Sequence, residues 1–297
     1  MQPFWPRRSP HFLACRRAVR PFAGPAVIGL SGGADSLTLA AAAAAEGKDV
    51  TAVVVDHGLQ PGSAEVAERA AAQARAWGLP ADIVRVTVGE GNLEAEARRA
   101  RYAALRSFGH GARDVWVAHT ADDQAETLLL GALRGNPSGM APREGDLVRP
   151  FLGIRRADTE GACAELGVEP WHDPMNTDRS FRRVRVRREV IPQLTDLIGG
   201  DAVPALARTA GRIAEGRALV ASISDTTPTD DCVELSRDPA PVRRRRILAW
   251  LAHHGVRADG SQLDAIDALI TRWKGQGPVT LARGRGVRRR GTTLEVT

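Results

Sequence analysis

Residues 26–40 constrain the fold of this chain more than any other segment, and they read AVIGLSGGADSLTLA. A short apolar run typical of a buried strand is followed by Ser-Gly-Gly and then by an alanine- and leucine-rich helical pattern. The two glycines permit a tight turn and a close approach of the backbone to a ligand. The amides of Gly32, Gly33 and Ala34 can then point outward at a helix N-terminus, where an anion is favoured.

The polar residues of this turn indicate a pyrophosphate site that works with a metal ion. Ser31 and Ser36 supply hydroxyl donors, whereas the carboxylate of Asp35 repels phosphate unless Mg²⁺ lies between them. The alternative is a plain strand-to-helix turn in which Asp35 caps the helix. The six residues from Ser31 to Ser36 resemble the PP-loop of the N-type ATP pyrophosphatases. A kinase-type phosphate loop fits less well, because it needs a lysine in the turn and the chain has only Lys48 and Lys274.

After this turn, short β-rich runs alternate with helical stretches, which predicts an α/β fold with a parallel sheet covered on both faces. The predicted strands span residues 26–30, 50–55, 83–88 and 115–118. We expect a basic N-terminal arm, a PP-loop (Rossmann-like) ATP pyrophosphatase domain, a helical connector with a linker, and a small α+β C-terminal domain. In that order, these parts span residues 1–25, 26–198, 199–230 and 231–297.

Acidic residues follow three of the predicted strands. Asp35 follows the first, Asp56 and His57 the second, and Asp122 and Asp123 the fourth. Ligands of open α/β sheets bind beyond the carboxyl ends of the strands, so these acids are expected to converge on one crevice. Glu126 lies about one helical turn after Asp122 and Asp123, and His119 lies just before these two aspartates. Such a group can hold Mg²⁺, orient an ammonium or transfer protons, although acids are also common in a first helical turn.

Composition indicates a globular protein with a polyanionic partner. The net charge is +6 and 43% of the residues are hydrophobic, with no apolar run approaching the roughly 18 residues of a membrane span. The three cysteines, at positions 15, 163 and 232, show no CxxC spacing, which favours burial in a reducing, cytoplasmic setting. Single arginines carry little weight here, because only two of the 41 basic residues are lysines.

Dense arginine clusters are more informative, because they have no obvious acidic counterparts nearby in the sequence. They fit contacts to a phosphate backbone, with a solvated basic face as the alternative. The residues predicted to contact RNA are Arg183, Arg185, Arg187, Arg188, Arg243, Arg244, Arg245, Arg246, Arg288, Arg289 and Arg290.

The order of these motifs resembles the tRNA-isoleucine lysidine synthase family, most clearly over residues 27–192. The matching segments are residues 31–36, 55–59, 92–95, 122–127, 139–140, 149–150 and 173–174, with Arg98, Arg101, Tyr102, His119, Trp171, Asn176, Arg183, Arg185 and Arg187. Two positions depart from the family pattern. Thr120 stands where a second histidine is usual, which argues against a histidine pair in proton transfer. Val184 stands in place of an asparagine.

The resemblance implies a ligase that uses ATP and Mg²⁺ to join free L-lysine to the wobble cytidine of tRNA-Ile with a CAU anticodon. Asp35, Asp123 and His119 are then the expected catalytic residues, with Asp35 and Asp123 as metal ligands. The expected ATP-binding residues are the six of the turn. The expected contacts to lysine or other substrate groups are Asp56, His57, Arg98, Arg101, Asp122 and Glu126.

Two other functions remain open from the sequence. One is a different PP-loop tRNA-modifying enzyme of the thiolase type, which needs a cysteine or a cluster near the site. The other is a nucleotide-dependent RNA-binding protein without catalysis, in which the clustered acids would be redundant. The sequence also leaves the oligomeric state open, a homodimer included.

Overall fold

The computed structural model describes residues 5–6, 8–58, 60, 62–87, 93–108 and 114–297, without the side chains of residues 93–95 and 283. The chain divides into two compact units. Unit 1 comprises Met1–Glu126 and Met140–Arg208, and unit 2 comprises Thr127–Gly139 and Thr209–Thr297. Two helices cross the division, α5 (Ala121–Ala132) and α9 (Val203–Ile223).

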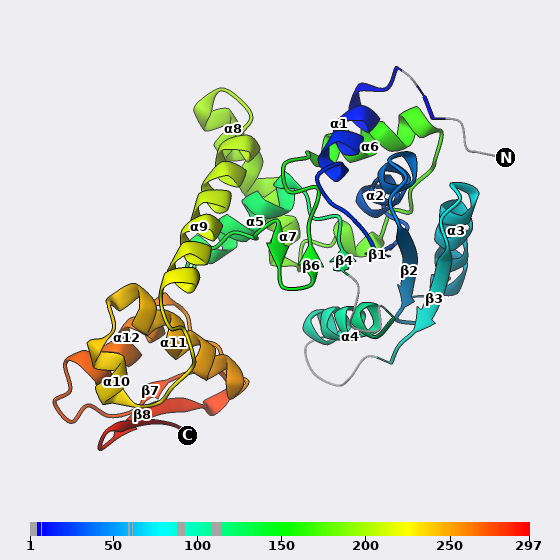
Figure 1. Cartoon of the computed structure of the whole chain (residues 1–297). Helices are drawn as coiled ribbons and strands as arrows, with labels where there is room; N and C mark the ends of the chain where they lie inside the picture. The colour runs from blue at the N-terminus through cyan, green and yellow to red at the C-terminus, as the bar shows by residue number, and fades with distance from the viewer. Residues whose placement is uncertain (1–4, 7, 59, 61, 88–92, 109–113) are drawn as a thin grey trace. The chain divides into compact units, whose positions relative to one another are not determined.

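Unit 1 alternates strands and helices, as the sequence pattern predicts (Figure 1). Its strands are β1 (Ala26–Gly29), β2 (Val50–Asp56), β3 (Ala81–Arg85), β4 (Asp114–Trp116), β5 (Arg143–Glu144) and β6 (Leu147–Val148). Its helices, apart from α5 and α9, are α1 (Pro10–Val19), α2 (Ala34–Ala45), α3 (Ser63–Ala76), α4 (Leu93–Phe108), α6 (Arg156–Leu166), α7 (Arg182–Arg185) and α8 (Ile191–Ile198). A 3₁₀ turn, Pro174–Asn176, precedes α7, and a π-helical turn, Val186–Val190, joins α7 to α8.

The six strands form one sheet in the order β3-β2-β1-β4-β6-β5, with β1, β2, β3, β4 and β6 parallel and β5 antiparallel to β6. The two central strands β1 and β4 are paired in register from Ala26 with Asp114 to Ile28 with Trp116. The predicted α/β fold with a mainly parallel sheet is therefore confirmed. The short antiparallel strand β5 was not predicted, since two residues give no usable periodicity.

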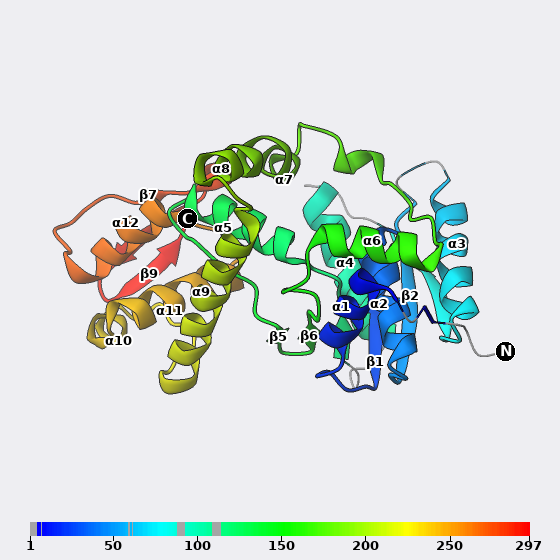
Figure 2. The ribbon, with the colours of Figure 1, turned by 90° about the horizontal axis from the view of Figure 1, so that it is seen from above.

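The sheet has an apolar core on each face. Ile28 and Val54 belong to a core that includes residues of α1, α2, α3 and α6, whereas Val27 and Val53 belong to a core with Leu105 of α4. Successive residues of one strand thus point into different cores, which explains the continuous apolar runs of β1 and β2. Figure 2 shows α1, α2 and α6 on the same side of the strands.

The N-terminal segment differs from the predicted basic arm. Residues 10–19 form α1, and its side chains Phe12, Cys15 and Val19 are fully buried against the core. Of the arginines of this helix, Arg17 is exposed and Arg16 pairs with Glu46 at 2.7 Å. The charge bias of the segment concealed an amphipathic helix.

Unit 2 contains three helices and a small antiparallel sheet, in addition to parts of α5 and α9. The helices are α10 (Cys232–Arg237), α11 (Ala240–His253) and α12 (Gly260–Thr271), and the sheet has the order β7 (Val279–Thr280), β8 (Gly286–Arg290), β9 (Thr293–Val296). Buried Leu235, Ile247, Leu251, Ile266 and Leu294 join these elements in one core. Among the described residues, no helix combines the length and the apolar character that a crossing of a lipid bilayer requires.

Candidate active site

The Ser-Gly-Gly turn lies at the carboxyl edge of the sheet, between β1 and α2. Gly32 adopts φ +81°, which side chains rarely tolerate, and Gly33 is the N-cap of α2. Gly33 has no side chain with which to cap this helix start, and its own N–H lies 3.5 Å from the hydroxyl oxygen of Ser31. The first amides of α2 are therefore available to an anion.

Ser36 of the turn differs from its predicted role as a phosphate donor. The Ser36 hydroxyl donates to the carbonyl of Gly33 at 3.0 Å and accepts from the N–H of Ser31 at 3.1 Å. Ser36 is only 6% exposed, whereas Ser31 is exposed. Ser36 thus closes the turn, and Ser31 is the serine whose hydroxyl is accessible to a phosphate.

Four carboxylates gather beside this turn, and we call Asp35, Asp122, Asp123 and Glu126 the acidic cluster. Arg156, at the start of α6, lies among them. Its Nη2 is 3.0 Å from Asp123, its Nε is 3.5 Å from Asp35 and its Nη1 is 3.5 Å from Glu126. The predicted convergence of the first and fourth strand ends therefore occurs, around a cation that the sequence did not indicate.

Asp35 is the member of the acidic cluster that belongs to the turn itself. The hydroxyl of Thr159, on α6, donates a short hydrogen bond to it. Burial raises the pKa of Asp35 to about 6, against the opposing effect of Arg156. A carboxylate that is poorly solvated next to an anion site gains from a nearby cation.

Asp35 and Asp123 fit the donor set that Mg²⁺ prefers, because both present carboxylate oxygens to the same guanidinium. Among the described residues, no three His, Cys, Asp or Glu side chains are arranged to hold a metal ion by themselves. Magnesium is commonly bound through one or two carboxylates together with substrate phosphates, and two carboxylates beside a phosphate turn provide that arrangement.

Thr120 explains one departure from the family pattern. Its backbone N–H and its hydroxyl both donate to Oδ2 of Asp123, at 2.8 and 3.0 Å, and the residue is fully buried. Thr120 therefore orients a predicted metal ligand. Neighbouring His119 has no hydrogen-bond partner for Nδ1 in the described structure, and burial lowers its pKa to about 3. His119 is thus neutral at physiological pH.

Glu126 is enclosed by arginines, which differs from the expectation of an open ammonium site. The residue is fully buried. Its carboxylate lies 2.7 Å from Nε of Arg187 and 3.7 Å from Nη1 of Arg183, in addition to Arg156. Two arginines predicted to contact RNA are therefore turned toward the acidic cluster, and the sequence separation of about sixty residues hid this pairing.

Asp122 is likewise engaged within the protein. It accepts hydrogen bonds from the side chain of Arg155, at 3.1 and 3.2 Å, and from the backbone N–H of Arg156, at 2.8 Å. Arg155 also makes a short ion pair with Asp201. Asp122 thus anchors the start of α6, a structural role that the prediction of a substrate contact did not include.

Asp56 is the last residue of β2 and His57 follows it, at the same edge of the sheet. Oδ1 of Asp56 accepts from the N–H of Gly58 at 2.9 Å, which lowers the pKa of this carboxyl. Its Oδ2 lies 3.6 Å from Nε of Arg85. Burial, followed by the charge of Arg101, lowers the pKa of His57. Asp56 shapes this turn, whereas Nδ1 of His57 has no hydrogen-bond partner in the described structure.

Arg98 and Arg101 pack on the ring of Tyr102, with guanidinium carbons 4.9 and 5.4 Å from its centroid. Burial and then the charges of neighbouring arginines, Arg101 among them, lower the pKa of Arg98, while Tyr102 opposes this. This is a cationic patch on α4. The spacing of Arg98 and Arg101 from Glu94 in the sequence would also fit a surface ladder of ion pairs, but the side chain of Glu94 lies outside the described residues.

The remaining arginines of the first cluster are exposed. Arg182, Arg185 and Arg188 lie on the outer side of α7 and the π-helical turn, and Arg185 pairs with Glu189 at 3.5 Å. Val184 is 5% exposed. An apolar side chain at this position therefore packs inward, which accounts for the second departure from the family pattern.

The C-terminal clusters contain acidic counterparts that the sequence did not reveal. Arg243 and Arg246 are 8% and 3% exposed, so their prediction as phosphate contacts was wrong. Arg243 pairs with Asp267 at 2.7 Å, and Arg246 with Asp238 at 2.9 Å. Both lie on the inner side of α11, where a guanidinium needs a fixed partner.

The other arginines of these clusters also have partners. Arg244 pairs with Asp264 at 2.9 Å, and Arg288 and Arg290 pair with Glu295 at 2.8 and 3.8 Å. Arg289 donates to the carbonyl of Leu269 at 3.0 Å, and Arg245 makes a short hydrogen bond to the carbonyl of Arg217. Arg244, Arg288 and Arg290 are exposed and remain candidates for RNA contacts.

Replacing Arg243 with alanine is expected to destabilise the full-length protein by about 3–5 kcal/mol, because the Asp267 carboxylate is left buried without its cation. The matched change at exposed Arg244 is expected to alter stability by less than about 1 kcal/mol. Urea unfolding followed by circular dichroism measures both. Equal effects of the two substitutions would contradict the buried ion pair.

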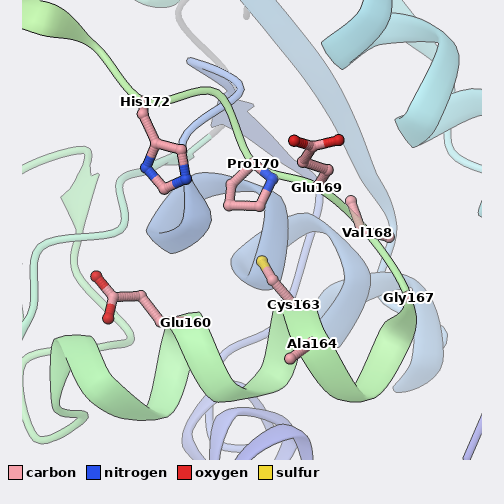
Figure 3. Close-up of a pocket in the computed structure, with 8 residues that line it drawn as sticks. All are labelled: Glu160, Cys163, Ala164, Gly167, Val168, Glu169, Pro170 and His172. Carbon is pink, nitrogen blue, oxygen red and sulfur yellow. The ribbon is translucent and has the colours of Figure 1, made fainter.

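A cavity of about 500 Å³ lies beside α6 (Figure 3). It is lined by Glu160, Cys163, Ala164, Gly167, Val168, Glu169, Pro170 and His172. Cys163 is buried and lies 3.4 Å from the hydroxyl of Thr38 on α2. Trp171 follows Pro170, and its backbone N–H donates to the carbonyl of Gly32 at 2.9 Å. This loop therefore supports the turn from outside.

The sequence did not indicate Arg155, Arg156 or Thr159, although all three contact the acidic cluster. Thr159 is 124 residues from Asp35 in the sequence, so no local spacing relates them. The two arginines were indistinguishable from the general arginine bias. The only local indication was their position before an amphipathic helix.

Comparisons with known proteins agree with this architecture. A family model of the PP-loop domain matches residues 17–194, and one of the TilS substrate binding domain matches residues 231–294. The U34-tRNA thiolase NcsA from Methanococcus maripaludis has a similar fold, with a TM-score of 0.57 and 16% identity over 73% of this chain and 82% of that chain.

The full-length relatives are much closer in sequence. The tRNA(Ile)-lysidine synthase of Corynebacterium diphtheriae is 52% identical, with 100% of both chains covered. The tRNA(Ile)-lysidine synthase of Corynebacterium glutamicum is 50% identical over 94% of this chain and 91% of its own length. With half of all residues shared over nearly the whole length and both family models matched in order, the chain belongs to the tRNA(Ile)-lysidine synthase family.

Proposed function

We propose that the protein uses ATP to join free L-lysine to the wobble cytidine of tRNA-Ile with a CAU anticodon, giving lysidine, AMP and pyrophosphate. The observation that carries this proposal is the uncapped start of α2 beside the acidic cluster. A site that combines anion-binding amides with carboxylates suits a reaction between a triphosphate and a substrate amine. Membership of the family supports the choice of substrates.

The first step activates the cytidine. Its C2 oxygen attacks the α-phosphorus of ATP, an O–P bond forms, and the bond to the β,γ-pyrophosphate breaks. The amides of Gly33 and Ala34 would bind the phosphate charge, and Ser31 would donate to it. Asp35 and Asp123 would hold magnesium, which when bound supplies positive charge to the departing pyrophosphate.

The second step forms the new carbon–nitrogen bond. The lysine ε-ammonium first gives a proton to a carboxylate of the site, the free amine attacks C2, the bond between C2 and its oxygen breaks, and AMP leaves with that oxygen. Glu126 is the carboxylate that we assign to the ammonium, and this requires it to exchange arginine partners for lysine. Neutral His119, with its low pKa, is suited to hydrogen bonding within the site rather than to storing a proton.

The test is incubation of the protein with ATP, labelled lysine and a panel of tRNA transcripts that includes tRNA-Ile with CAU and with other anticodons. We expect label in the CAU transcript alone, with one AMP released for each lysine joined. A thiolase-like enzyme would instead incorporate sulfur and no lysine. A protein that only binds nucleotide and RNA would release no pyrophosphate.

Exposed arginines of unit 1 are expected to contact the RNA backbone. Each lost phosphate contact reduces the steepness of the plot of log affinity against log salt by about 0.7–0.9. Replacing both Arg185 and Arg188 by glutamine should therefore make the plot less steep by about one to two units. Cognate and non-cognate tRNA should respond alike, because backbone contacts carry no sequence information. The same charge change at exposed Arg17 and Arg69 is the control and should leave the slope unchanged. An unaltered slope in the first variant would contradict the proposed contacts.

The proposal places the protein in the cytoplasm, with its tRNA substrate, where thiols stay reduced. All three cysteines are buried and free.

A further inference from the structure

Arg156 has an unusual set of partners. In the described part of the chain, it is the only basic side chain that forms an ion pair with Asp35, and the only one that forms an ion pair with Asp123. It also reaches Glu126, so one guanidinium contacts three carboxylates from two other helices. Its side chain is 20% exposed. Arg156 is therefore the main counter-charge of the site.

The backbone of Arg156 is fixed, whereas its side chain is held only through these carboxylates. The N–H of Arg156 donates to Asp122 at 2.8 Å, and its carbonyl accepts from the hydroxyl of Thr159 at 2.8 Å. The guanidinium donates to Asp123 at 3.0 Å and to Glu126 at 3.5 Å, and its Nε lies 3.5 Å from Asp35. The guanidinium is thus held at the acidic cluster by charge pairs, which a competing cation can replace.

A divalent cation and this guanidinium compete for the same oxygens. Magnesium binds oxygen at about 2.0–2.1 Å, which leaves no room for a guanidinium on the same faces of Asp35 and Asp123. Without a cation between them, the two carboxylates repel each other, because charges in a buried site are weakly screened. This repulsion raises the free energy of the metal-free site. Removal of Arg156 should therefore make the pair a better ligand for a free metal ion.

We propose that Arg156 is a positioning residue that holds Asp35 and Asp123 in the absence of ligand and gives them up to magnesium when the nucleotide enters. This inference rests on the proposed use of ATP and Mg²⁺. Because the guanidinium neutralises the pair, a free metal ion gains little by binding alone. The triphosphate changes this balance, because its phosphate oxygens can bind the metal ion and can also pair with the displaced guanidinium. Metal binding thereby becomes dependent on nucleotide binding.

The experiment titrates the full-length protein with MnCl₂ alone, with free Mn²⁺ measured by electron paramagnetic resonance. We expect Arg156→Gln to bind Mn²⁺ at least about tenfold more tightly than the wild type, because a competing charge is removed. Arg156→Lys keeps a positive charge and should lie between them. The matched control is Arg143→Gln, which loses an arginine that pairs with Asp114 at the start of β4, outside the acidic cluster, and it should bind Mn²⁺ as the wild type does.

A second variant locates the effect. Adding Asp35→Asn to Arg156→Gln should remove the gained Mn²⁺ affinity, and Mn²⁺ should raise the melting temperature of Arg156→Gln more than that of the wild type. If Arg156→Gln binds Mn²⁺ no better than the wild type, or if the double variant keeps the gain, the inference is wrong. Should Arg156→Gln fail to fold, the intermediate affinity expected of Arg156→Lys decides the question in the same assay.

This measurement is separable from the proposed function. It uses no ATP, lysine or tRNA, so a protein that makes no lysidine would still show the difference between the variants. Conversely, lysidine formation with unchanged Mn²⁺ affinity would overturn the role of Arg156 and leave the proposed function intact.

Discussion

Replacing Asp35 with alanine is expected to reduce adenylation of the tRNA by about a thousandfold, the scale seen when one electrostatic contact to a transition state is removed. The carboxylate lies in the first turn of α2, next to the amides that would bind phosphate. In this position it helps the reaction only through a cation, because by itself it repels the triphosphate. Pyrophosphate release in the presence of tRNA and ATP measures the effect.

The same variant should retain nearly all of its tRNA affinity, because Asp35 belongs to the nucleotide turn. Asp82→Asn, at an exposed aspartate of β3, is the control for removal of one carboxylate and should leave both quantities unchanged. Pyrophosphate release near the wild-type rate in Asp35→Ala would show that Asp35 merely begins the helix. A parallel loss of tRNA binding would instead indicate that the fold had been damaged.

The fold was largely accessible from the sequence, because its main signals are local. The alternation of apolar strands with helical patterns, and the glycine turn after β1, predict a parallel sheet with a ligand site at its carboxyl edge. The position of α1 was not accessible in this way. Its burial depends on Phe12, Cys15 and Val19 meeting the core, and the surrounding arginines and prolines suggested a basic arm.

The site was only half accessible, since sequence patterns identify charged residues but not their partners. The acids after β1 and β4 were found because strand ends converge in this fold. Arg156 and Thr159 were missed because they reach the site from a helix that is distant in the sequence. The opposite error occurred at Arg243 and Arg246, where a dense run on one helix looked like an exposed cluster. A helix turns successive residues to different sides, so the first and fourth of the four arginines point inward.

Replacing Glu126 with glutamine is expected to raise the KM for lysine by roughly ten- to a hundredfold, the range of one lost charged hydrogen bond of about 1.5–3 kcal/mol. Glutamine keeps the size of the side chain, so packing in this fully buried position changes little. The KM for ATP should change much less, because the nucleotide is bound by the turn. Initial rates of lysidine formation at varied lysine and varied ATP separate the two.

Glu126 also neutralises Arg156, Arg183 and Arg187, so a purely structural role must be distinguished. Glu126→Asp keeps the negative charge but shortens the side chain that reaches the arginines. It should retain more lysine affinity than Glu126→Gln. Glu144→Gln, at an exposed carboxylate that pairs with Arg149, is the control and should leave the KM for lysine unchanged. If Glu126→Gln raises both KM values equally, or lowers the melting temperature without a selective loss of lysine, the carboxylate serves the arginines and another group receives the ammonium. A selective loss would mean that Glu126 exchanges its arginines for lysine during the reaction, and that two of those arginines, Arg183 and Arg187, are released as lysine binds.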